Sequence, residues 1–247
     1  MRAAEPWAER MSDLSAAAWL HDRLLVWPTP ENEVLVGSVV PTGYQAYARV
    51  FHPAARWSGE RREEVRWTDV ASTTGRVAHP EMEWHRITAP KQGGAAAPGD
   101  IQAPNEGSLS REECVRLSSI LQRFTRTPEV CWFLMWVGFG DIPRAVLGID
   151  LPPDRRGWVE LPGREYLLYK GAVDAAPRAE VGFTYQSPNL WWPEDRAWCV
   201  ATEIDLTSTY VGGTEELIGI LETSDLEVLR TRPDARVDAE ADRINVD

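Results

Sequence analysis

The sequence predicts an α+β fold, with a mixed or mainly antiparallel sheet and helices packed on it. Segments rich in β-branched and aromatic residues outnumber the helical segments and do not alternate regularly with them. A doubly wound parallel sheet would need that alternation, so the sequence argues against it. Residues 131–137, CWFLMWV, are apolar at odd and even positions alike. This pattern predicts a strand that is covered on both faces and therefore central in the sheet.

The N-terminal part predicts one helix and one hairpin. Apolar residues recur at helical spacing over residues 12–25, and Pro28 ends the pattern. Residues 34–51 combine two runs of branched and aromatic residues with a Pro-to-Gly turn at 41–43 between them. That order predicts a β-hairpin.

A loop and a second helix are predicted next. The segment 91–107, KQGGAAAPGDIQAPNEG, is rich in Gly, Ala and Pro and has no apolar period, which is typical of a loop or linker. Residues 1–231 are therefore expected to form either a single globular domain or two lobes divided by this loop. Ser110 and Glu113 then form a capping box, which predicts a helix over residues 110–124.

The last part of the chain predicts further strands, one helix and a tail. The expected strands are bounded by Pro or Gly and cover residues 145–149, 158–161, 166–169 and 197–206. Thr214, followed by two glutamates, is expected to cap the last helix. Residues 232–247 contain few apolar side chains, which predicts a frayed acidic tail.

Composition limits the classes of function. With 43% hydrophobic and 26% charged residues, the chain of 247 residues is expected to fold. The longest apolar run, residues 130–137, is too short to span a bilayer, and the N-terminal residues offer no secretory segment. Three separate cysteines without a CxxC pair complete the case for a cytoplasmic protein. The net charge of −12 argues against direct binding to nucleic acid and favours a partner with a basic surface, or mimicry of nucleic acid.

Two carboxylates are the candidate catalytic groups. In a strand over residues 197–206, alternation places Glu203 and Asp205 on one face, above small side chains. Such a pair suits general acid and base catalysis, or the binding of a hard cation by paired oxygens, and His52 or His79 is the candidate third group. The competing interpretation is a solvated face without function. No motif of metal-ligand spacing occurs, so no metal site is predicted, and no cofactor is indicated.

Two further features are candidate binding elements. Trp191 and Trp192 are adjacent, so in an extended segment one of them is expected to be exposed beside Arg196 as a binding hot spot. The alternative is a tryptophan that packs over the sheet edge. Gly212 and Gly213 lead towards the last helix, where backbone N–H groups bind anions, although most turns of this kind are plain connections.

Four segments carry a resemblance to a family. Residues 36–54, 79–87, 161–173 and 187–218 together resemble a family of actinobacterial proteins. The resemblance covers most of the chain but implies no activity, fold or site residue. The acidic, Trp-rich α+β character is also loosely similar to the SUKH class of bacterial immunity proteins, which is an analogy of fold class.

Two hypotheses of function follow. The leading one is a protein-binding factor of regulatory or immunity type, which acts through an acidic surface that contains tryptophan. The alternative is a hydrolase-like or transferase-like enzyme that uses Glu203 and Asp205 with a histidine. Nothing in the sequence indicates the oligomeric state.

Overall fold

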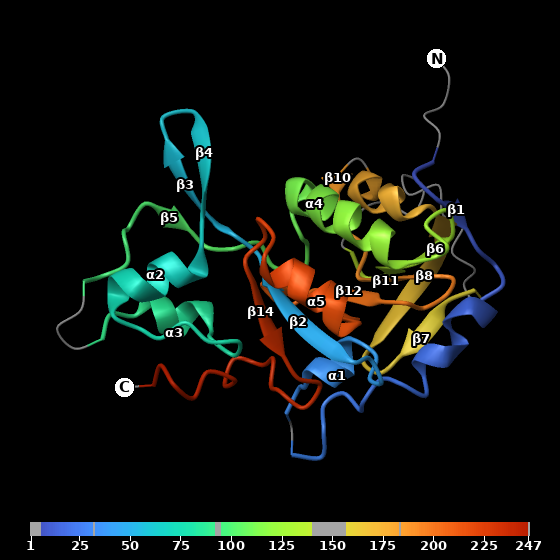
Figure 1. The fold of residues 1–247 in the computed structure, drawn as a ribbon, viewed down its shortest axis with the longest axis horizontal. Helices are drawn as coiled ribbons and strands as arrows, with labels where there is room; N and C mark the ends of the chain where they lie inside the picture. Colours follow the sequence, from blue (N-terminus) through green and yellow to red (C-terminus); the bar gives the residue numbers. More distant parts are fainter. Residues whose placement is uncertain (1–5, 32, 92–94, 140–156, 183, 247) are drawn as a thin grey trace.

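A computed structural model describes residues 6–31, 33–91, 95–139, 157–182 and 184–246 (Figure 1). The main sheet contains β1 (Glu9–Arg10), β2 (Ala46–Phe51), β6 (Cys131–Trp136), β7 (Val159–Leu161), β8 (Arg164–Gly171), β11 (Leu190–Pro193), β12 (Cys199–Thr202), β13 (Ser208–Gly213) and β14 (Val228–Thr231). Within the described ranges their order is β1-β8-β6-β11-β12-β13-β2-β14, with β7 paired to β8. Every pairing is antiparallel, so the predicted α+β class is confirmed.

Both faces of this sheet are covered. The segments that pack on it are η1 (Ser15–Leu20), α1 (Val36–Val39), α4 (Arg111–Leu121), η2 (Gln122–Phe124), η3 (Val173–Arg178) and α5 (Glu215–Glu222). One core cluster joins the sheet to α4, η3 and α5, and a second joins the opposite face to η1, α1 and the C-terminal segment. In β6, Phe133 belongs to the first cluster and Leu134 to the second, which confirms the strand predicted to be covered on both faces.

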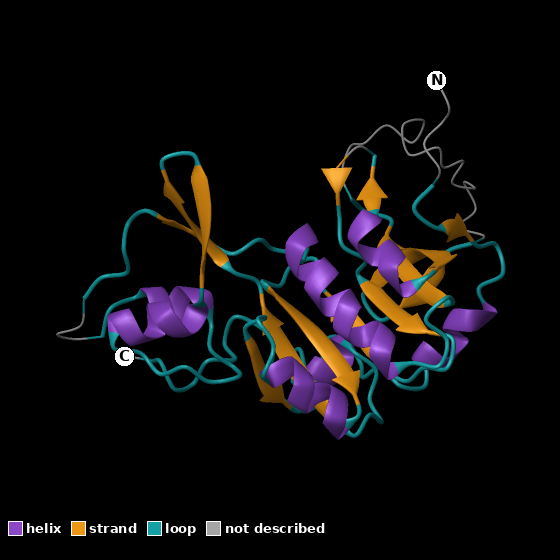
Figure 2. Cartoon of the chain, turned by 45° about the horizontal axis from the view of Figure 1, so that its top comes forward, coloured by secondary structure: helices purple, strands orange, loops and turns teal. Residues whose placement is uncertain are grey.

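A smaller unit adjoins the end of β2. It contains β3 (Ala54–Ser58), β4 (Arg61–Val65), β5 (Ile101–Gln102), α2 (Trp67–Thr74) and α3 (Trp84–Thr88). Its strands follow the order β4-β3-β5, and Figure 2 shows the hairpin β3–β4 projecting away from the main sheet. Gly59, at φ +63°, occupies the first position of the two-residue turn, where hairpins favour glycine. The predicted loop 91–107 contributes β5 to this sheet. A short hairpin of β9 (Glu180–Val181) and β10 (Thr184–Tyr185) lies elsewhere.

The two predicted helix caps are confirmed. Ser110 Oγ accepts from the N–H of Glu113 at 3.2 Å at the start of α4. Thr214 Oγ1 accepts from the N–H of Leu217 at 3.2 Å at the start of α5. No helix of the described residues is long and apolar enough to cross a membrane.

Two predicted elements near the N-terminus are wrong in part. The helix expected over residues 12–25 is only the short η1, because the N–H of Leu25 bonds to Gly37 and not back along the chain. Residues 36–39 form the helical turn α1 and not a hairpin strand. The N–H groups of Val36 and Gly37 are instead bound by the carbonyl groups of Ala235 and Pro233. The strand expected at 145–149 lies outside the described residues.

The predicted frayed tail is also wrong, because residues 232–246 pack on the protein. Ala235 and Val237 are buried in the second core cluster, and Leu35 forms an isolated bridge with Arg236. The segment then runs past α3 (Figure 1). There the buried carboxylate of Asp242 accepts hydrogen bonds, among them one from the N–H of Glu83 at 3.1 Å. Few apolar residues are enough here because specific polar contacts anchor the rest of the segment.

Candidate functional site

Glu203 and Asp205 lie together, although not in a strand. β12 ends at Thr202, and the N–H of Asp205 donates to Glu203 Oε2 at 2.7 Å within the following turn. Arg164, at the start of β8, binds Glu203 Oε1 through its Nε at 2.9 Å and Asp205 Oδ2 through its Nη2. The side chain of Glu203 is buried, so Arg164 compensates a carboxylate that water hardly reaches.

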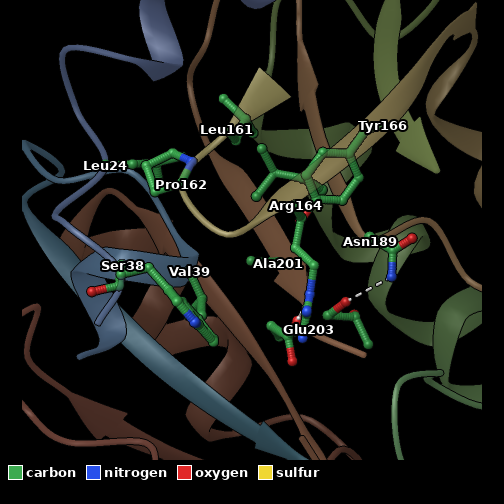
Figure 3. Close-up of a pocket in the computed structure, with 13 residues that line it drawn as sticks. Leu24, Ser38, Val39, Leu161, Pro162, Arg164, Tyr166, Asn189, Ala201 and Glu203 are labelled. Carbon is green, nitrogen blue, oxygen red and sulfur yellow. Dashed lines mark hydrogen bonds and ion pairs between the residues drawn. The ribbon is translucent and has the colours of Figure 1, made fainter. Parts of the chain in front are cut away.

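The pocket beside Glu203 is small. Figure 3 shows Arg164 reaching down to Glu203, with Asn189 bonded to the carbonyl group of Thr202 at 3.1 Å. The cavity has a volume of about 20 Å³, which is room for about one water molecule. The pocket therefore suits a structural water better than a substrate.

His52 is buried in a separate hydrogen-bond network. Its Nδ1 lies 2.7 Å from the carbonyl oxygen of Asn105, and its Nε2 lies 2.9 Å from Thr209 Oγ1. Because a carbonyl oxygen only accepts, Nδ1 carries the proton and Nε2 accepts from the threonine. Burial lowers the pKa of His52 to about 4. The imidazole is therefore neutral at pH 7, and its hydrogen bonds are not with Glu203 or Asp205.

His79 anchors the C-terminal segment. Its Nε2 lies 2.8 Å from Asp242 Oδ1, which also accepts from the N–H of Asn245 at 2.9 Å. The structure therefore does not bring His52 or His79 to the carboxylate pair. No group of three or more His, Cys, Asp or Glu side chains that could hold a metal occurs in the described ranges.

Arg49 forms a buried cationic network. Its Nε donates to Ser208 Oγ at 2.8 Å, and its Nη2 binds Glu83 Oε1 at 3.2 Å. Its Nη1 donates to the carbonyl groups of Pro80 and Met82 at 3.0 and 2.9 Å. Burial raises the pKa of Glu83 to about 7, against the opposing effect of Arg49. This network joins β2 to the segment before α3 and uses four of the five N–H groups of Arg49.

Trp191 and Trp192 are both buried, each with 1% of its surface exposed. The expectation that one of them would be exposed is wrong because both faces of the sheet are covered. Trp191 packs edge-on against Trp198 in the first core cluster, at 5.2 Å between ring centroids. Trp192 packs edge-on against Trp19 on the opposite face, at 5.8 Å.

The exposed tryptophan is Trp57, which sequence reasoning missed. It lies on β3 in the projecting hairpin, and 55% of its surface is exposed. The signal in the sequence is the stretch 56–64, RWSGERREE, in which one tryptophan precedes a Ser-Gly-Glu turn and a run of four charged residues. A charged strand of this kind is typical of a protected sheet edge.

Arg196 borders a larger cleft of about 460 Å³. Its guanidinium carbon lies 5.1 Å from the centre of the Trp19 ring, and Gly213 also lines the cleft. Gly212 and Gly213 are not a loop, because both pair within β13, opposite Tyr47 and Ala46 of β2. The prediction that these glycines form a turn whose N–H groups bind an anion is therefore wrong.

Comparison with known proteins finds no matching family model, and neither a curated protein nor a solved structure matches the chain.

Proposed function

We propose that this chain is a protein-binding factor of regulatory or immunity type that recognises a partner with a basic surface. The observation that carries the proposal is the exposure of Trp57 on a hairpin that projects from the protein (Figures 1 and 2). Tryptophan is enriched among the residues that dominate binding energy at protein interfaces, because its burial removes a large apolar surface from water.

The hairpin holds Trp57 in a defined position. Trp57 lies opposite Arg62, and β3 is paired on its other side with β5. Arg116 of α4 binds Glu64 of β4 at 3.2 Å, which ties the hairpin to the main body. An aromatic side chain on a supported hairpin loses little freedom when a partner covers it.

An acidic hollow on the opposite face of the hairpin supplies the charge. It has a volume of about 290 Å³, and Glu63 and Asp69 line it. Arg56 also lines it, but the charge of Arg56 is compensated by Asp100 at 3.0 Å. In the described part of the chain, Glu63 and Asp69 form no ion pair. A lysine or arginine of the partner would pair with them. The partner would then contact the hairpin on two faces, the one with Trp57 and the one with the acidic hollow.

The net charge of −12 supports the same partner chemistry, because it attracts a basic protein over distances of about a Debye length. We further propose that the protein acts in the cytoplasm. Its three cysteines, Cys114, Cys131 and Cys199, are unpaired and buried, as is usual in a reducing compartment.

The enzyme is the weaker proposal. Arg164 compensates both Glu203 and Asp205, and neither candidate histidine contacts them. The enzyme proposal would be supported by a catalytic activity that Glu203→Gln and Asp205→Asn both reduce.

The test of the binding function is to titrate the protein into fluorescent peptides that differ in their content of Arg and Lys. Binding is measured by fluorescence anisotropy at low and at high salt. Affinity should rise with basic content and fall with salt. Trp57→Ala should weaken binding by about 30-fold, the loss typical of a tryptophan hot spot. The double variant Glu63→Gln, Asp69→Asn should reduce the salt dependence.

The matched control for charge is Glu129→Gln with Glu160→Gln, which removes two exposed carboxylates at other places. This control should bind the peptides as the wild type does. If the Trp57 and Glu63 variants also bind like the wild type, the hairpin is not the binding surface and the proposal fails.

A further inference from the structure

The cleft that Arg196 borders is independent of the hairpin. It is lined by η1 and the turn after it, by the loop before β2, by the turn before β12 and by the start of α5. Its volume of about 460 Å³ lies in the range of small-molecule sites, whereas the pocket beside Glu203 has only about 20 Å³. None of its lining residues belongs to the projecting hairpin.

Two uncompensated guanidinium groups line the cleft. Arg23 and Arg196 form no ion pair within the described ranges, although most arginines there do. Asp22 is the one carboxylate among the described lining residues, so the lining side chains carry a net positive charge. An anion is therefore the complementary ligand.

One hydrogen bond positions the guanidinium group of Arg23, whose side chain is otherwise exposed. Arg23 Nη1 donates to the carbonyl oxygen of Thr42 at 3.3 Å, and the N–H of Thr42 donates back to the carbonyl oxygen of Arg23 at 2.7 Å. Gly43 has a φ of +96°, and a Cβ there would lie 2.1 Å from Arg23 Nη1. The positive φ favours glycine at this position, and a side chain there would displace the flexible end of Arg23.

The backbone at Arg196 is in a conformation that arginine rarely adopts. Its φ is +54°, and among described residues it is the one residue other than glycine with a positive φ. The N–H of Arg196 donates to the carbonyl oxygen of Pro193 at 2.8 Å and closes the turn. Strained residues of this kind cluster at ligand sites, where the side chain has a use that offsets the strain.

Two aromatic side chains of the wall carry polar atoms without partners. Trp19 Nε1 and Tyr44 Oη are buried and have no hydrogen-bond partner in the described structure. Burial raises the pKa of Tyr44, and the positive charges of Arg23 and Arg196 oppose that effect. The two arginines therefore act on the same hydroxyl group. Both polar atoms have almost no surface accessible to solvent, so they lie behind the wall of the cleft and not at its surface.

We propose that this cleft binds a small organic anion. Its carboxylate or phosphate group lies between Arg23 and Arg196, and its flat apolar part packs on Trp19. The N-terminus of α5 at Thr214 adds a partial positive charge to the same wall.

The test is calorimetric titration of the full chain with phenyl phosphate, benzoate and inorganic phosphate. At least one of the two aromatic anions should bind with a dissociation constant of about 1 mM or tighter, as expected for two charge-assisted contacts. Phenyl phosphate should bind more tightly than inorganic phosphate, because only its ring can pack on Trp19. The stronger of the two aromatic probes identifies the preferred anionic group.

Two variants locate the site. Arg23→Gln and Arg196→Gly should each raise the dissociation constant about tenfold or more. Arg196→Gly keeps the fold testable, because glycine adopts a positive φ readily. Arg123→Gln removes one exposed arginine elsewhere and should bind like the wild type, and so should Trp57→Ala.

The proposal is overturned if no aromatic anion binds saturably, or if the two cleft variants bind as well as Arg123→Gln does. Equal affinity for phenyl phosphate and inorganic phosphate would refute the proposed packing of the ligand on Trp19. A loss of binding in Trp57→Ala equal to that in the cleft variants would also refute it, because the cleft shares no residue with the hairpin.

Discussion

Replacing His52 with asparagine should remove one defined part of the pH dependence of stability. Burial lowers the pKa of His52 to about 4 from its ordinary value of 6.5; the positive charge of Arg49 lowers it further, and the bond to Asn105 opposes both. The unfolded chain therefore takes up a proton at a higher pH than the folded chain. As the pH falls from 6.5 towards 4, the folded state loses stability.

The size of the effect follows from the two pKa values. The complete loss is about 3 kcal/mol, and between pH 7 and pH 5 it is about 2 kcal/mol. Asparagine at position 52 retains a donor for the carbonyl group of Asn105 but loses the contact with Thr209, which costs about 1 kcal/mol at pH 7. At pH 5 the His52→Asn variant should therefore be the more stable protein.

The assay is urea unfolding of both proteins at pH 7 and pH 5, followed by circular dichroism. The decisive quantity is the difference in free energy of unfolding between the two proteins. Buried carboxylates change the stability of both proteins with pH, in the direction opposite to His52, and their effect cancels in this difference. Burial raises the pKa of Glu83 to about 7 and that of Glu113 to about 8, so each adds stability as the pH falls. A difference that is the same at both pH values would refute the neutral, buried state of His52.

Three further variants test other parts of the structure. Arg164→Gln should destabilise the protein by about 2 kcal/mol in urea unfolding because it leaves the buried charge of Glu203 unpaired. Adding Glu203→Gln should recover part of that loss. If the two losses simply add, Arg164 does not compensate Glu203. Asp242→Ala should cost about 3 kcal/mol and make the C-terminal segment sensitive to limited proteolysis, whereas wild-type resistance would mean that the segment is not anchored there. Trp191→Ala should cost about 4 kcal/mol of stability without changing the peptide affinity of the folded fraction, and an effect on affinity comparable to that of Trp57→Ala would restore Trp191 as a binding residue.

Local signals predicted the elements that depend on nearby residues. The caps at Ser110 and Thr214 need only the next three residues, and the strand at 131–137 is identified by its own apolar pattern. The elements that were wrong depend on distant partners. Residues 36–39 are helical because two of their N–H groups bond to the chain near residue 235.

The candidate site follows the same rule. The adjacency of Glu203 and Asp205 was predictable because they are neighbours in sequence. Their compensation by Arg164 was not, because only the turn after β12 and the start of β8 together create it. The burial of Trp191 and Trp192 likewise depends on both faces of the sheet being covered, which no local pattern reports.

The position of β2 constrains how the chain is made. Phe51 pairs with Ser208, and Val50 pairs with Val228, so β2 has no neighbour in the sheet until residues 208–231 have been synthesised. During synthesis at roughly 5 to 20 residues per second, β2 therefore waits on the order of 10 s for the residues that cover it. During that time β2 is an apolar strand without neighbours, and an unpaired strand of this kind is a site where other chains pair.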